Sequence, residues 1–221
     1  AQTADFKPAN AAFSRRRRAA TRPIARSRHD AYSLLRAMST APTLRAPARP
    51  IALVGLMGVG KSTIGRRLAS RLSRRFADAD EAVAEAAGRS VADIFADFGE
   101  AAFREGERKV IARLMEEPDP MVLALGGGAF VDPQTRSLLK ARAVTIWLKA
   151  DLDTLMERVG RKPGQRPLLD DPDPRAVMAR LMKDREPAYA QADIAVQSES
   201  GSHDLTVANV LEALDALEAE R

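Results

Sequence analysis

Three short apolar runs, 51–56, 121–125 and 143–148, are the clearest feature of the hydrophobic pattern. Their hydrophobicity is almost continuous, whereas a strand with one face in water alternates between apolar and polar residues. Continuous runs of this length predict strands buried on both faces, as in a parallel sheet covered by helices. Residues 194–196 and the stretch around Phe76 are weaker strand candidates.

Helical patterns lie between these runs. An apolar repeat at i, i+4 and i+8 is formed by Ile64, Leu68 and Leu72, and another apolar repeat covers 204–220. Ser90 and Asp93 form a capping box before a short helix that stops at Gly99. A capping aspartate precedes a proline at Asp132-Pro133 and at Asp173-Pro174. Alternating strands and helices predict one three-layer α/β domain, 50–221, with right-handed crossovers.

The positive charge of the chain is concentrated before this domain. The net charge is +5, yet residues 1–49 alone carry ten arginines and Lys7 against Asp5 and Asp30. Residues 50–221 are mildly acidic, so we expect no nucleic-acid partner for the domain. Segment 1–49 is interpreted as a basic, disordered extension. A targeting segment and an over-long start, with Met38 as the true first residue, are the alternatives.

Composition excludes several classes of site. The chain has no cysteine and only two histidines, His29 and His203, so thiolate chemistry, disulfides, histidine triads and multi-histidine metal sites are excluded. No apolar run approaches the roughly 18–20 residues that a membrane helix needs. We expect a cytoplasmic monomer without a membrane partner.

The sharpest motif is Gly55–Ser62, which fits G-x-x-x-x-G-K-[ST]. It follows the first predicted strand and opens the first predicted helix, which is the context of a phosphate-binding loop. Glycines allow backbone N–H groups to approach phosphate oxygens, and the helix N-terminus adds unpaired donors. In such a loop Lys61 reaches the β- and γ-phosphates, and the Ser62 hydroxyl ligates Mg²⁺. The motif therefore predicts binding of ATP or GTP.

Two aspartates, Asp78 and Asp80, stand at the predicted end of the strand around Phe76. In an extended chain residues i and i+2 point to the same side. One carboxylate would then bind Mg²⁺ and the other would accept a hydrogen bond from an acceptor hydroxyl. The competing interpretation is a helix N-terminus enriched in acidic residues.

Further candidates lie downstream. Gly126–Gly128 ends the second predicted strand and indicates a ligand against the backbone, although a plain turn is the alternative. Arg104 and Arg185 suit a carboxylate-bearing substrate, although for either arginine taken alone a solvated helix face is the commoner explanation. The polar stretch 160–172 carries Arg166 and is either a lid or a mobile linker.

Taken together these residues resemble the shikimate kinase family. The resemblance covers essentially all of 50–221 and rests on five blocks in order: Gly55–Ser62, Phe76–Asp80, 99–105, Gly126–Gly128, and Arg166-Pro-Leu-Leu followed by Arg185 and Tyr189. It implies a P-loop fold like that of nucleoside monophosphate kinases, with a central parallel sheet. It also implies transfer of the γ-phosphate of ATP to the 3-hydroxyl of shikimate, in chorismate and aromatic amino-acid biosynthesis.

The resemblance also implies roles for individual residues. Shikimate would be bound by Asp80, which is also the candidate base, by Arg104 and Arg185 at its carboxylate, and by the Gly127 backbone. ATP would be bound by Gly58, Val59, Gly60, Lys61, Ser62, Thr63 and Arg166; Lys61 and Arg166 would act on the transferred phosphate, and Ser62 and Asp78 would hold Mg²⁺. Either Arg158 or Arg161 would contact adenine.

Three rival functions differ in what they require. A P-loop kinase for gluconate or a nucleoside monophosphate would share the phosphate loop without the other blocks. A switch or assembly ATPase would need an acidic residue where the 121–125 strand ends, and Gly126 stands there. Nucleic-acid binding through the extension would be salt-sensitive and independent of ATP.

Overall fold

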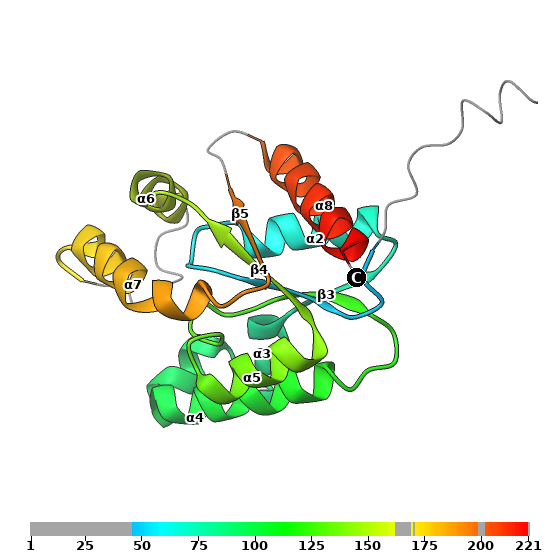
Figure 1. Cartoon of the computed structure of the whole chain (residues 1–221). Coiled ribbons are helices and arrows are strands. Elements are labelled where there is room, and N and C mark those ends of the chain that lie inside the picture. The colour runs from blue at the N-terminus through cyan, green and yellow to red at the C-terminus, as the bar shows by residue number, and fades with distance from the viewer. Residues whose placement is uncertain (1–45, 162–168, 170, 199–201, 221) are drawn as a thin grey trace, which may run out of the picture. The chain divides into compact units, whose positions relative to one another are not determined.

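The computed structural model describes residues 46–161, 169, 171–198 and 202–220 of the chain. The predicted extension, apart from residues 46–49, lies outside the described residues, and so does Arg166 in the predicted lid. The elements, labelled as in Figure 1, are β1 (Ile51–Val54), α2 (Lys61–Arg71), β2 (Arg75–Asp78), α3 (Ala79–Ala87), α4 (Val91–Leu114), β3 (Met121–Ala124), α5 (Pro133–Arg142), β4 (Val144–Lys149), α6 (Leu152–Gly160), α7 (Pro174–Tyr189), β5 (Ile194–Gln197) and α8 (His203–Ala219).

The strands form one five-stranded sheet in the order β2-β3-β1-β4-β5, and every pair is parallel. The three continuous apolar runs became the central strands β3, β1 and β4, and the two weaker candidates became the edge strands β2 and β5. Every residue of β1 and β3 is buried, whereas both edge strands carry exposed residues. The predicted α/β fold with a central parallel sheet is confirmed.

Helices cover both faces of this sheet (Figure 1). Helices α2 and α8 pack together on one face, against β3 and β5, and α3, α4 and α5 lie on the other. Gly65 allows α2 to approach the sheet closely, because a Cβ at this position would lie 2.5 Å from the Phe76 ring and 3.2 Å from Leu53 Cδ1. The helix therefore fixes the end of the phosphate loop firmly against β1 and β2.

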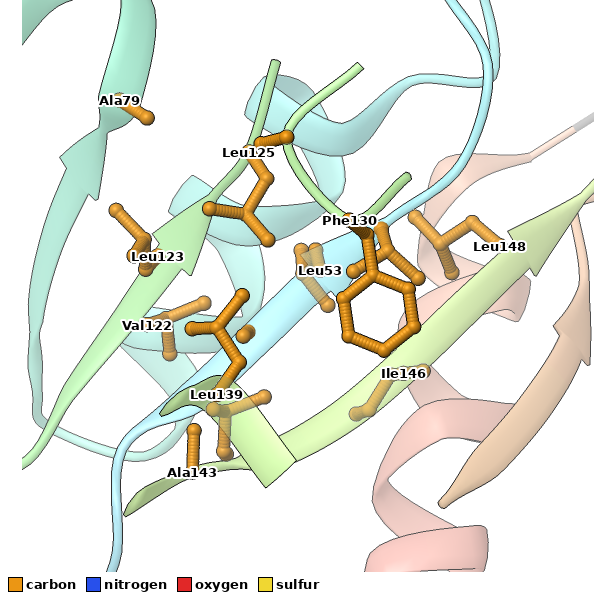
Figure 2. Close-up of a cluster of buried hydrophobic side chains, with 14 of the residues drawn as sticks. Leu53, Ala79, Val122, Leu123, Leu125, Phe130, Leu139, Ala143, Ile146 and Leu148 are labelled. Carbon is orange, nitrogen blue, oxygen red and sulfur yellow. The ribbon is translucent and has the colours of Figure 1, made fainter. Parts of the chain in front are cut away.

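The apolar core lies between the sheet and the helices (Figure 2). Leu53, Leu123 and Ile146 come from the three central strands, and Phe130 and Leu139 reach them from the segment after β3 and from α5. All five are essentially inaccessible to solvent. Burying a side chain of this size contributes about 1.5–3 kcal/mol each, so the central strands form a rigid base for the segments that follow them.

The predicted helix caps are present. Ser90 accepts a hydrogen bond from the Asp93 backbone N–H, and Asp132 and Asp173 cap α5 and α7 with a proline at the start of each helix. Gly99 has φ 78° and ψ 174° inside α4. The short helix predicted to stop at Gly99 therefore ends in a kink, after which α4 continues.

Parallel strands bring the predicted site segments to one edge of the sheet. Ala124 of β3 is paired with Leu53 of β1 on one side and with Asp78 of β2 on the other. The phosphate loop and the triple glycine begin just beyond Leu53 and Ala124, and the aspartate pair begins at Asp78 itself. The carboxyl edge of the sheet is where open α/β folds bind ligands.

Candidate active site

The phosphate loop connects β1 to α2. Gly55, Gly58 and Gly60 have φ of 139°, 83° and 99°, a region that side chains with a Cβ rarely adopt. Space adds a second requirement at Gly55, since a Cβ there would lie 2.6 Å from the Leu148 carbonyl oxygen. Gly60 is the N-cap of α2, and no side chain caps this helix. The loop thus presents backbone N–H groups at the positive end of a helix dipole, which is an arrangement that binds phosphate.

Lys61 folds back over this loop. Its Nζ donates hydrogen bonds to the carbonyl oxygens of Gly55 at 2.8 Å and Leu56 at 3.0 Å. These bonds hold the ammonium group beside the loop rather than in bulk solvent. The predicted phosphate cation is therefore in position at the edge of the sheet.

Ser62 and Asp78 are joined directly. The Ser62 hydroxyl donates to Asp78 Oδ2 at 2.6 Å, and Asp78 Oδ1 accepts the Asp80 backbone N–H at 3.1 Å. The described residues contain no group of three or more acidic or imidazole side chains that would hold a metal by themselves. A hydroxyl and one carboxylate nevertheless suit Mg²⁺, which usually keeps several waters and takes its remaining ligands from one or two carboxylates and substrate phosphates.

The aspartate pair differs from the extended geometry that the spacing predicts. Asp78 is the last residue of β2 and the N-cap of α3, and Asp80 lies in the first turn of that helix. The competing interpretation, a helix N-terminus enriched in acids, thus describes the local structure correctly. It does not remove Asp80 from the site, because the Asp80 carboxylate still faces the triple glycine.

The environment of Asp80 raises its pKa. Desolvation is the largest cause, although part of the side chain is open to solvent, and the Asp78 carboxylate raises the pKa further. Lys61 and Arg104 act in the opposite direction. Charges from the phosphate loop and from α4 therefore both act on this carboxylate.

The triple glycine is explained by the side chains that surround it. A Cβ at position 126 would lie closest to Glu107 Oε1, and 2.8 Å from Asp80 Oδ1. One at 127 would lie 3.1 Å from Arg185 Nη1, and one at 128 would lie 2.8 Å from Arg104 Nη1. None of the three glycines has a positive φ, so space and not backbone conformation requires them. The three glycines were predicted to leave space for a ligand, but side chains of the protein lie against them.

Arg104 and Arg185 come from different helices, α4 and α7, and meet at neighbouring glycines. Position 127 also lies against the phosphate loop, since its Cβ would be 3.6 Å from the Met57 backbone nitrogen. The Arg185 Nη1 atom is buried, and within the described residues it has no hydrogen-bond partner. Two guanidinium groups, one with an unused donor, therefore converge beside the loop.

Glu107 is a site residue that the sequence analysis missed. Its side chain is 2% exposed, and its Oε2 accepts a hydrogen bond from Arg104 Nη1 at 2.7 Å. Glu100 accepts hydrogen bonds from the same guanidinium at 3.2 and 3.3 Å, so a carboxylate lies on each side of Arg104. Burial raises the pKa of Glu107, against the opposing effect of Arg104. The i, i+3 spacing of Arg104 and Glu107 on a helix was the available signal.

Tyr189 fixes the other side of the triple glycine. Its side chain is buried at the end of α7, and its hydroxyl donates to the Gly127 carbonyl oxygen. Burial raises the pKa of this phenol, so the hydroxyl keeps its proton and remains a donor. Arg185 stands one helical turn before Tyr189, and the anchored end of α7 therefore positions its guanidinium.

Arg158 and Arg161, the two candidates for the adenine contact, lie in different places. Arg158 Nη1 donates to the Val59 carbonyl oxygen of the phosphate loop at 3.1 Å and to Ser198 Oγ at 3.0 Å. Arg161 lies on the surface and forms an ion pair of 2.5 Å with Glu157. His203 reaches the same loop from α8, with Nε2 3.4 Å from the Cβ position of Gly60. Of the two arginines, Arg158 is the one beside the phosphate loop.

Comparison with known proteins agrees with this geometry. Residues 57–215 match the family model described as shikimate kinase. The curated shikimate kinase of Paramagnetospirillum magneticum is 56% identical over 167 residues, which are 75% of this chain and 84% of that protein. The shikimate kinase of Novosphingobium aromaticivorans is 51% identical over 174 residues, which are 77% and 90% of the two chains.

Solved structures give the same result. A structure described as shikimate kinase from Acinetobacter baumannii in complex with shikimate has a TM-score of 0.72 and 32% identity, over 76% of this chain and 93% of that one. A gluconokinase from Sinorhizobium meliloti has a TM-score of 0.56 at 17% identity, over 78% of this chain and 95% of that one, and shares the fold alone. The range matched by the family model includes Lys61 and Ser62, the aspartate pair, the triple glycine, Arg104 and Arg185. With the curated relatives and the solved structure, this shows that the chain belongs to the shikimate kinase family.

Proposed function

We propose that the phosphate loop and the cluster around Gly126–Gly128 are the ATP and shikimate halves of one active site. As a member of its family, the chain phosphorylates shikimate with ATP, a reaction of aromatic amino-acid biosynthesis. The 3-hydroxyl is the proposed acceptor. The observation that carries the proposal is the row of consecutive glycines, which faces Asp80, Arg185 and Arg104 in turn while Gly127 lies against the phosphate loop.

The carboxylate of shikimate is the proposed ligand of Arg104 and Arg185. A guanidinium donates two parallel hydrogen bonds to a carboxylate, and these are stronger than hydrogen bonds between neutral groups. Arg185 Nη1 is buried without an acceptor among the described residues, and such a donor is stabilised when a ligand supplies one. Gly127 adds a backbone contact at the same place.

Asp80 is the proposed base. It would accept a hydrogen bond from the shikimate hydroxyl and take its proton as the phosphate is transferred. Desolvation raises the pKa of Asp80, which makes its carboxylate a stronger base than that of an ordinary aspartate. The Lys61 ammonium, whose charge acts on the Asp80 carboxylate, lies on the side from which the phosphate would arrive.

The phosphates of ATP are the proposed ligands of the loop. The residues concerned are Gly58, Val59, Gly60, Lys61, Ser62 and Thr63. Lys61 would exchange its bonds to the loop carbonyls for the γ-phosphate and neutralise charge in the transition state. Arg158 is favoured for the adenine contact, because it lies beside the loop and Arg161 does not. Arg166 keeps its proposed role at the transferred phosphate on the resemblance alone.

Ser62 and Asp78 are the residues that fit a divalent cation, and Mg²⁺ is the proposed ion. When bound with ATP, Mg²⁺ would neutralise part of the charge of the phosphates. The chain's own contribution is to keep a hydroxyl and a carboxylate 2.6 Å apart where α2 begins.

The predictions on organisation and partners remain proposals. We propose that 50–221 is the kinase domain and that 1–49 is a basic extension. We further propose that the protein is a cytoplasmic monomer. Among the helices that the structure describes, none is both long and apolar enough to cross a membrane.

A coupled assay of ADP release tests the function. With ATP and Mg²⁺, we expect turnover with shikimate and none with gluconate or AMP. Asp80→Asn should lower kcat by about 10²- to 10⁴-fold and leave ATP affinity nearly unchanged. Asp119→Asn is the control, because Asp119 is exposed before β3, at the opposite edge of the sheet. An unchanged kcat in Asp80→Asn would remove Asp80 from the chemistry.

A further inference from the structure

A cavity lies between α3 and α4, apart from the cluster around the three glycines. Its volume is about 390 Å³, which is within the range of small-molecule sites. None of the residues that line it is among those facing Gly126–Gly128. The cavity is therefore not part of the proposed shikimate or ATP sites.

Its walls are mostly apolar. Val83 from α3 and Ile94, Phe103 and Val110 from α4 form buried surface, and Gly106 leaves the space in front of them open, because a Cβ there would meet no atom within 4 Å. An apolar body of one ring would cover this surface. A helix or an extended peptide would exceed the volume.

Two cations stand at the rim. Lys109 and Arg113 are one turn apart on α4, so they lie on the same side of that helix. Lys109 is paired with Glu105 at 2.7 Å in an exposed ion pair, which is a weak interaction that a ligand can replace. In the part of the chain that the structure describes, no ion pair involves Arg113. The positive charge of these two side chains suits a ligand in which an anionic group is attached to the apolar ring.

Phe103 connects this cavity to the proposed shikimate site. Phe103 lines the cavity, and the centroid of its ring lies 5.1 Å from the Arg104 guanidinium carbon. Phe95 packs against the same ring, with centroids 4.7 Å apart. A ligand that contacts Phe103 therefore acts on the ring against which Arg104 lies.

We infer that the cavity between α3 and α4 is a binding site for a small apolar carboxylate, and that its occupancy alters shikimate binding through Phe103 and Arg104. The second part rests on the role proposed above for Arg104. The first part stands on the cavity and its rim alone.

The test uses 3-phenylpropionate as the probe and 3-phenylpropionamide as its uncharged match. Calorimetric titrations of the full chain are made with shikimate at saturation, so that the guanidinium groups of the active site are already occupied. We expect the acid to bind with a dissociation constant on the order of millimolar and the amide to bind at least fivefold more weakly. Absence of binding by the acid, or equal binding of acid and amide, overturns the inference.

Two variants locate the binding. Gly106→Leu places a side chain in the open space of the cavity and should weaken binding of the probe at least tenfold. The fold should be kept, because leucine is a better helix former than glycine. Arg113→Gln should weaken the acid several-fold and leave the amide unchanged. Probe binding that is unaltered by Gly106→Leu contradicts the assignment of the cavity.

Steady-state kinetics test whether occupancy of the cavity alters shikimate binding. Saturating probe should change the KM for shikimate at least threefold, with a plateau, and should leave the KM for ATP unchanged in the wild-type chain. The same addition should have no effect on Gly106→Leu. An effect that grows without a plateau would mean direct competition with shikimate and would overturn the connection. If Arg104→Ala leaves the KM for shikimate unaltered, the proposed function fails. The probe titrations would still show whether the cavity binds 3-phenylpropionate.

Discussion

The phosphate loop and the acceptor cluster meet at one edge of the sheet, but they are built differently. The loop is one continuous segment, Gly55–Ser62, whose glycines are required by positive φ and whose ligand-binding groups are largely backbone. The acceptor cluster takes its side chains from α3, α4 and α7, and its glycines are required by the space those side chains fill. A binding site made of backbone is visible in a short stretch of sequence, whereas one made of convergent side chains depends on the whole fold.

The largest effect is expected for Lys61, in the phosphate loop, and it tests whether the loop and the acceptor cluster act separately. Lys61→Met should lower kcat by about 10²- to 10³-fold, as loss of one electrostatic group at the transferred phosphate does. Shikimate affinity measured by calorimetry should change much less, because Lys61 Nζ donates hydrogen bonds to two carbonyl oxygens of the phosphate loop. Lys140→Met, on the exposed surface of α5, is the control. An equal loss of shikimate affinity would mean that the halves are not separate.

The next effect lies in the acceptor half. Arg104→Ala should raise the KM for shikimate by about 10- to 100-fold, since charge-assisted hydrogen bonds contribute about 1.5–3 kcal/mol. The KM for ATP should change much less. Thermal unfolding should also occur at lower temperature, because Glu107 is left buried without its partner. Steady-state kinetics in both substrates give the answer, and equal changes in both KM values would argue against a carboxylate-binding role.

A smaller change tests the spatial requirement at the glycines. The methyl group in Gly128→Ala would lie where the Arg104 guanidinium now lies, so the guanidinium must move, and the KM for shikimate should rise by about tenfold. Gly160→Ala is the matched control, because a Cβ there meets nothing within 4 Å. Similar kinetics for the two variants would show that position 128 tolerates a side chain.

The smallest effect concerns pH. If Asp80 is the base, kcat/KM falls as pH falls through its pKa, because the protonated carboxyl accepts no proton, and this limb lies above the ordinary range of aspartate. Glu81 contributes to the raised pKa, so Glu81→Gln should move the limb to lower pH while the plateau is kept. A pH-rate profile measures both. A limb that persists unaltered in Asp80→Asn would belong to another group.

Much of the fold could be predicted because it follows from local patterns. Continuous apolar runs identified the central strands, and Ser90, Asp132 and Asp173 marked helix starts correctly. The aspartate pair was placed at the right edge of the sheet with the wrong local geometry, since spacing alone does not tell where a strand gives way to a helix. Glu107 was missed because a buried acid on a charged helix has the same sequence pattern as an exposed one.

The triple glycine has a consequence for changing what the enzyme accepts. A side chain at any of its three positions would crowd a neighbour, because Glu107, Arg185 and Arg104 lie against them in turn. Redesign toward a different acceptor therefore has to begin on the surrounding helices, where a side chain can be shortened first, before the strand-end positions are enlarged to fill the gap.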